Sequence, residues 1–226
     1  MRSFFVTSSG TDVGKSHMMA TLCWQLKQSG KKVTALKPIM SGYNDEFLVS
    51  DAATILTSCG LTPTAALIET ISPWRYKAPL APNMAAAAEG RPQPQLADVA
   101  SFCRDHSALA NDVLLVEGVG GVMVPMNDEH TMLDLMQNLA WPAIIVVGSY
   151  LGTISHTLTA IEVLKNRGIT IHALVVNQSP NSDVRIEDTV STFEKFIPES
   201  IPILKLPRSD KPEPWKHMPL ISWIAD

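Results

Sequence analysis

The stretch FFVTSSGTDVGKS, residues 4–16, joins a short apolar run to a loop that ends in Gly-Lys-Ser. A G-x-x-x-x-G-K-S/T loop between a strand and a helix holds phosphate oxygens on successive backbone N–H groups. In that pattern Lys15 reaches the terminal phosphates, and the Ser16 hydroxyl can bind Mg²⁺. Counting back from Gly14, however, places Ser9 where the first glycine should stand. The stretch therefore predicts a phosphate-binding loop with an irregular start.

Short apolar runs rich in β-branched residues recur along the chain and alternate with segments of helical spacing. Runs without polar alternation are typical of strands buried on both faces of a parallel sheet. The alternation predicts a doubly wound α/β fold, with a mostly parallel sheet and helices on both faces, as in P-loop NTPases. The length of 226 residues suits a single domain, residues 1–226. We predict strands at 4–8, 33–36, 112–118, 143–149, 171–177 and 201–206, and helices at 15–28, 95–110, 131–139 and 153–166.

Two segments depart from this alternation. Residues 61–94 contain six prolines, which exclude a long helix or a central strand, so we expect an excursion over the edge of the sheet. The proline-rich tail after residue 207 is expected to be irregular.

Composition favours a small-molecule substrate. The net charge of -4 comes without a basic stripe, which argues against binding to nucleic acid or to an anionic membrane. The three cysteines lack CxxC spacing and indicate reduced thiols, neither a disulfide framework nor a zinc site. We find no signal peptide and no apolar run near the roughly 20 residues that span a bilayer, so we expect a cytoplasmic protein.

A carboxylate stands at the end of the predicted strand 112–118, where open α/β sheets bind their ligands. Glu117 ends this apolar run and precedes the glycine-rich Gly118-Val119-Gly120-Gly121, which lets the backbone approach a ligand closely. Nucleotide chemistry needs a magnesium carboxylate at such a strand end. Glu117 is therefore a candidate metal ligand, and a solvated strand-end charge is the alternative.

Two other charged residues are ambiguous from the local sequence. Lys37 follows the predicted strand 33–36 and, if that strand is parallel to the first, emerges beside the phosphate loop as a second cation for a transferring phosphoryl group. A strand-end lysine is more often a solvated surface group. Asp51, at the head of a predicted helix, could bind a metal or merely cap the helix.

Five motifs follow one another along the chain: VTSSGTDVGKS at 6–16, LKPIMSG at 36–42, VSDAA at 49–53, LVEGVGG at 115–121 and VVNQ at 175–178. Taken together they resemble the dethiobiotin synthetases in order, spacing and strand context, from about residue 5 to about residue 207. That family closes the ureido ring in biotin biosynthesis. The resemblance implies a homodimeric, ATP-dependent ligase that uses Mg²⁺ and converts 7,8-diaminononanoate, CO₂ (or bicarbonate) and ATP into dethiobiotin, ADP and phosphate through a phosphorylated carbamate.

The same resemblance implies a role for each matching residue. The catalytic group comprises Lys37, Lys15 and Thr11. The residues that the resemblance implies bind the nucleotide are Asp12, Val13, Gly14, Lys15, Ser16, His17, Asp51, Glu117, Gly118, Val119, Gly120, Asn177, Gln178, Pro207, Arg208 and Ser209. Mg²⁺ falls to Ser16, Asp51 and Glu117. Substrate contacts fall to Ser41 and to Gly152, Thr153 and Ser155, which begin a helix expected to hold the remote carboxylate of the substrate across the dimer.

This chain departs from the family pattern at three places. Gln178 stands where the family usually has aspartate, which leaves the nucleotide preference open. Ser155 stands where some relatives have asparagine. The first glycine of the family loop falls on Ser8, and the hydroxyl of Ser8 or Ser9 can bond to nearby backbone instead.

A switch ATPase of the partition or cell-division type is the alternative reading of the P-loop. Such proteins carry an additional lysine early in the loop, and none occurs between residues 1 and 14.

Overall fold

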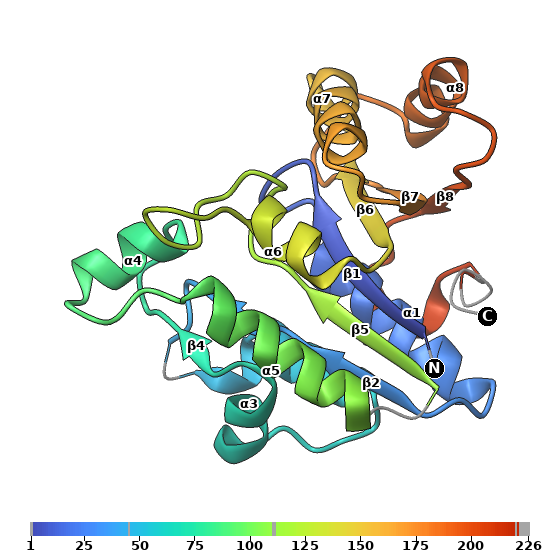
Figure 1. Ribbon diagram of the computed structural model, residues 1–226. Helices are drawn as coiled ribbons and strands as arrows, with labels where there is room; N and C mark the ends of the chain where they lie inside the picture. The colour runs from blue at the N-terminus through green and yellow to red at the C-terminus, as the bar shows by residue number, and fades with distance from the viewer. Residues whose placement is uncertain (1, 45, 110–111, 220, 222–226) are drawn as a thin grey trace.

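A computed structural model describes residues 2–44, 46–109, 112–219 and 221. Its centre is a six-stranded sheet with the order β2-β5-β1-β6-β7-β8, in which every pair is parallel (Figure 1). The chain leaves β1 toward β2 on one side and later returns to β6 on the other, so the carboxyl end of β1 is a switch point between the two halves. The strands are β1 (Arg2–Ser8), β2 (Val33–Leu36), β5 (Val113–Glu117), β6 (Ala143–Gly148), β7 (Ile171–Asn177) and β8 (Ile203–Leu206).

Helices cover both faces of this sheet, as the alternation of the sequence predicts. Helix α1 (Lys15–Gln28) packs on one face, and α5 (Leu96–Leu109), α6 (Met132–Leu139), α7 (Thr153–Asn166) and α8 (Ile186–Phe196) pack on the other. Neighbouring strand residues enter opposite cores: Phe4 and Val6 pack with α1, and Phe5 packs on the other face. The doubly wound fold class is therefore confirmed.

The proline-rich segment contains short elements only. Helices α3 (Ala65–Ile71) and α4 (Pro82–Ala88) flank β4 (Trp74–Arg75), which pairs with β3 (Ile39–Met40) in a separate two-stranded sheet. Pro82 stands in the first turn of α4, where its missing N–H costs nothing. Helix α2 (Asp51–Ser58) and the 3₁₀ turn η1 (Phe47–Val49) precede this segment.

Several elements differ from the sequence prediction. Helix α8 is not predicted, although its buried residues Ile186, Val190 and Phe193 follow helical spacing. The last strand begins at Ile203 and not at residue 201, because Pro202 has no N–H to donate to a sheet. The tail, predicted to be irregular, contains the 3₁₀ turn η2 (Pro214–His217), which packs against α1. The helix predicted at 95–110 ends at residue 110, which lies outside the described residues.

Within the described part of the chain, no helix is both long enough and apolar enough to cross a bilayer.

Candidate functional site

A cavity of about 750 Å³ opens at the carboxyl edge of β1, β2 and β5. It collects residues that the sequence proposes from four separate motifs: Thr11, Asp12, Gly14, Lys15, Ser16, His17, Lys37, Ser41, Asp51, Glu117, Val119 and Gly120. Sequence reasoning missed four further lining residues, Pro79, Leu80, Ala81 and Val124, none of which lies in a recognisable motif.

The phosphate loop, residues 8–16, passes from β1 into α1 through two left-handed residues, Asp12 and Gly14. Gly14 has φ 93°, and an added Cβ would lie 1.9 Å from the Asn177 Nδ2 atom. Asn177, at the end of β7, donates a hydrogen bond from Nδ2 to the Val13 carbonyl at 3.1 Å. Asn177 therefore holds the phosphate loop through the Val13 carbonyl, and only a glycine at residue 14 leaves room for the Asn177 side chain.

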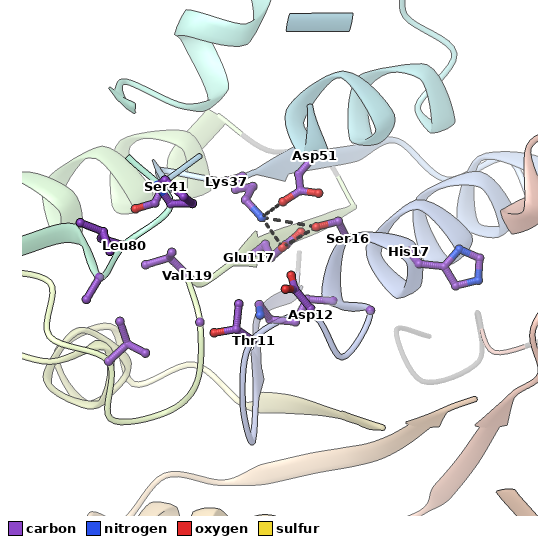
Figure 2. A pocket seen from close by; sticks show the side chains of 16 residues that line it. Thr11, Asp12, Ser16, His17, Lys37, Ser41, Asp51, Leu80, Glu117 and Val119 are labelled. Carbon is purple, nitrogen blue, oxygen red and sulfur yellow. Dashed lines mark hydrogen bonds and ion pairs between the residues drawn. The ribbon is translucent and has the colours of Figure 1, made fainter. Parts of the chain in front are cut away.

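Lys37 lies at the centre of a network of charged and polar side chains (Figure 2). Its ammonium is 2.5 Å from Asp51 Oδ2, 2.6 Å from Glu117 Oε1 and 3.3 Å from Ser16 Oγ. Ser16 in turn donates to Glu117 Oε1 at 2.7 Å. The network unites the ends of β2 and β5 with the first residues of α1 and α2.

This geometry excludes one of the two local alternatives for each of the three charged residues. Lys37 is 4% exposed and the Glu117 side chain is fully buried, so neither is a solvated strand-end charge. Asp51 is not the cap of α2, because the Ser50 hydroxyl accepts the capping bond from Ala53 N at 3.2 Å. The Asp51 carboxylate is therefore left to face Lys37.

The two lysines of the cavity have opposite electrostatic surroundings. Burial lowers the pKa of Lys15, and the nearby Glu117 carboxylate only partly offsets this. Burial also disfavours the charged form of Lys37, but the carboxylates of Glu117 and Asp51 outweigh it and raise the pKa of that lysine. The Lys37 ammonium in turn lowers the pKa of Asp51 against the effect of burial. Lys37 is thus neutralised within the protein, whereas Lys15 lacks a carboxylate partner among the described residues.

The oxygen atoms around Lys37 fit a magnesium ion. Glu117 Oε2 is buried without a hydrogen-bond partner among the described residues, so this carboxylate has an unused acceptor. Mg²⁺ prefers oxygen ligands and is usually held by one or two carboxylates with water and phosphate completing the shell. The described residues hold no cluster of three or more His, Cys, Asp or Glu side chains that would form an all-protein cage. Two carboxylates and the Ser16 hydroxyl match the simpler pattern.

The loop after β5 packs closely on the rest of the site. Gly118 has no space for a side chain, because an added Cβ would lie 2.9 Å from the Phe5 ring. Val119 and Gly120 line the cavity. The glycine-rich sequence is therefore needed for close packing as well as for access.

Of the predicted base-binding residues, Asn177 contacts the phosphate loop, whereas Gln178 and Arg208 do not line the cavity. Gln178 and Arg208 line a second, shallower hollow of about 600 Å³, and Gln178 Oε1 accepts a hydrogen bond from the Arg208 backbone N–H at 2.9 Å. Pro207 and Ser209 flank Arg208 after β8. Burial and the Arg208 charge lower the pKa of His17, whose ring points away from Lys37 in Figure 2.

The residues predicted to bind the remote carboxylate are not among those that line the cavity. Gly152 caps the start of α7 with φ 100°, and the buried Thr153 hydroxyl donates to the Gly148 carbonyl at 2.7 Å. Ser155 is exposed, and Leu151 is 92% exposed. This helix start therefore faces outward from its own chain.

A parallel sheet with a phosphate loop at its switch point, a lysine in the loop and a carboxylate on the adjacent strand defines a P-loop nucleotide-binding protein. A family model described as an AAA domain matches residues 2–211. In solved structures, a ParA family ATPase from Chlorobium tepidum superposes with a TM-score of 0.54 at 16% identity, over 92% of this chain and 85% of that one. The MinD cell division protein of Aquifex aeolicus gives 0.53 at 16%, over 93% and 84%. At this identity the likeness concerns the fold alone.

Sequence relatives are much closer. An ATP-dependent dethiobiotin synthetase BioD from Caulobacter vibrioides is 43% identical over 212 residues, 92% of this chain and 94% of that protein. A second, from Acidiphilium cryptum, is 41% identical over 199 residues, 87% of this chain and 89% of that protein. The chain belongs to the ATP-dependent dethiobiotin synthetase family, and the switch-ATPase alternative is not supported.

Proposed function

We propose that this chain forms dethiobiotin from 7,8-diaminononanoate, CO₂ or bicarbonate, and ATP, with Mg²⁺ as the metal. The observation that carries the proposal is the meeting of two buried lysines with two carboxylates and the phosphate loop in one cavity. The reaction gathers negative charge from a carbamate and a triphosphate at one point. A site that concentrates cations suits that chemistry.

The phosphate loop and Lys15 would bind the nucleotide. Lys15 is 7% exposed, and its ammonium lacks a carboxylate partner among the described residues, so an anion that enters the cavity would supply its counter-charge. Thr11 and Asp12 line the same cavity. Binding the terminal phosphates would therefore relieve an electrostatic cost that the ligand-free fold carries.

Ser16, Asp51 and Glu117 would hold Mg²⁺. When bound, the metal would neutralise phosphate charge and polarise the phosphoryl group. A metal there and the Lys37 ammonium would compete for the same oxygen atoms, which leaves Lys37 available to face the phosphorylated carbamate. Ser41 lines the same cavity and has a buried hydroxyl without a partner among the described residues, as a substrate contact would require.

The proposed chemistry needs no nucleophilic side chain. A carbamate formed on one substrate amine takes the γ-phosphoryl group of ATP, and ADP leaves. The second amine then attacks the carbamate carbon, and phosphate leaves as the ring closes. Lys15 and Lys37 would stabilise the charge that develops on the transferring and departing phosphate.

We further propose a homodimer in which α7 of one copy meets the substrate bound to the other. The outward-facing start of α7 does not line the cavity of its own chain, yet helix N-termini attract carboxylates. The exposed Leu151 beside it would be covered by a second copy.

We propose that the nucleotide base is bound by residues at the ends of β7 and β8, namely Asn177, Gln178, Pro207, Arg208 and Ser209. The proposed location of the protein is the cytoplasm.

The test is an assay of the purified protein with Mg-ATP, bicarbonate and 7,8-diaminononanoate. We expect dethiobiotin and ADP in equal amounts, each dependent on the diamine. Lys37→Met should lose turnover, and Lys195→Met, at an exposed lysine of α8, should retain it. ADP release that is indifferent to the diamine would refute the synthetase assignment. Sedimentation of the protein tests the homodimer separately.

A further inference from the structure

Ser8 ends β1 at the point where the chain enters the phosphate loop, and it is fully buried. Its Oγ atom lies 2.5 Å from the Gly10 carbonyl and 2.8 Å from the Gly120 carbonyl. It also accepts a hydrogen bond from Lys15 Nζ at 3.1 Å. A hydroxyl has one proton and two lone pairs, so the two carbonyls share its proton and the ammonium takes a lone pair. A glycine or an alanine at residue 8 could neither donate to these carbonyls nor accept from the Lys15 ammonium.

Ser8 directs Lys15 without neutralising it. Among the described residues, Ser8 Oγ is the one hydrogen-bond acceptor of the Lys15 ammonium. An ammonium has three donors, so two remain for an incoming anion. This differs from Lys37, whose ammonium is held by two carboxylates.

Ser8 also fastens the phosphate loop to the loop that follows β5. Its carbonyl accepts a bond from Val122 N at 3.1 Å, in addition to the side-chain bond to Gly120. The two loops touch closely enough that a Cβ at Gly121 would lie 3.3 Å from both Gly10 N and Ser8 O. The same hydroxyl therefore contacts both loops and the phosphate-binding lysine.

We propose that Ser8 is a positioning residue that aims the Lys15 ammonium at the terminal phosphates of the nucleotide. The identity of the anion rests on the proposed function, whereas the contacts of Ser8 do not. The Ser8 hydroxyl contacts the Gly10 carbonyl, the Gly120 carbonyl and the Lys15 ammonium at once, which fixes the start of the loop relative to the lysine.

A double-mutant cycle tests this role through nucleotide binding alone. ATP affinity is measured by calorimetry in EDTA, so that metal ligation does not enter, for the wild type, Ser8→Ala, Lys15→Met and the double variant. In the presence of Lys15, we expect Ser8→Ala to weaken ATP binding about tenfold, which corresponds to the loss of a hydrogen bond to a charged group. In the Lys15→Met background, we expect the same substitution to weaken ATP binding less than about threefold. If Ser8→Ala does not fold, Ser8→Gly removes the same hydroxyl.

Ser58→Ala is the matched control, because the Ser58 hydroxyl is also buried but lies in α2, where it donates to the Ile55 carbonyl at 2.7 Å, and should not affect ATP affinity. An equal loss in both backgrounds would reduce Ser8 to a structural residue and overturn the proposal, as would no loss at all. ATP binding without dethiobiotin formation would overturn the proposed function and leave this test intact. Failure of the wild type to bind ATP would overturn both.

Discussion

Lys37→Met should destabilise the ligand-free protein by about 3–5 kcal/mol, because it leaves a buried carboxylate without its counter-charge. The Glu117 side chain is 0% exposed and its ion pair with Lys37 measures 2.6 Å, so this pair dominates the loss. The Asp51 side chain is 50% exposed, and water screens its pair with Lys37, which adds at most about 1 kcal/mol. For a chain of this size each kcal/mol moves the melting temperature by about 2–4 °C, so a fall of roughly 6–20 °C is expected.

Mg²⁺ should restore more stability to Lys37→Met than to the wild type. In the wild type a metal must displace the lysine ammonium from Asp51, Glu117 and Ser16, whereas in the variant these oxygens are unpaired. A ligand at 100 times its Kd adds about 2.7 kcal/mol of stability. Differential scanning calorimetry in EDTA and in excess MgCl₂ measures both effects.

Lys15→Met is the matched control, since Lys15 is also buried but lacks a carboxylate partner among the described residues. Burial lowers the pKa of Lys15, so the fold stabilises its charged form less than water does. Its replacement should leave the melting temperature in EDTA unchanged or slightly raised. A Lys37→Met variant that melts like the wild type in EDTA, or that gains no more from Mg²⁺ than the wild type does, would refute the reasoning.

Other expectations follow from single contacts. Contact with the Cys23 thiol lowers the pKa of Cys59, and burial raises that of Cys103 to about 12, so iodoacetamide should label Cys59 first, as peptide mass spectrometry would show. Gly14→Ala should abolish ATP binding in calorimetry, because its Cβ would overlap a neighbouring amide. Burial alone would raise the pKa of Asp51, but the Lys37 ammonium lowers that pKa below its usual value. The ionised Asp51 therefore contributes its full stability above the unfolded-state pKa. This contribution is lost as the pH falls through the lowered pKa of the folded state. Urea titrations of wild type and Asp51→Asn between pH 3 and 7 should converge at the acid end.

The local sequence is sufficient to predict those parts of the structure that depend only on residues close together in the chain. The strands were predictable because runs such as residues 143–147 must be buried on both faces, and β6 is. The start of α1 and the lysine of the phosphate loop follow from one contiguous motif. Helix α8 was missed because it begins without a side-chain cap or a preceding glycine, although its spacing is amphipathic.

The sequence by itself determined the fold class, the phosphate loop and the residue types of the site, because periodicity and turn chemistry are local. Only the tertiary structure decided that β5 inserts between β1 and β2, which places Glu117 beside Lys37. It also decided that Asn177 lies beneath Gly14 and that Ser8 joins two loops and a lysine. These contacts join residues as far as 164 positions apart, and their energies depend on strand order and burial, which no local pattern specifies.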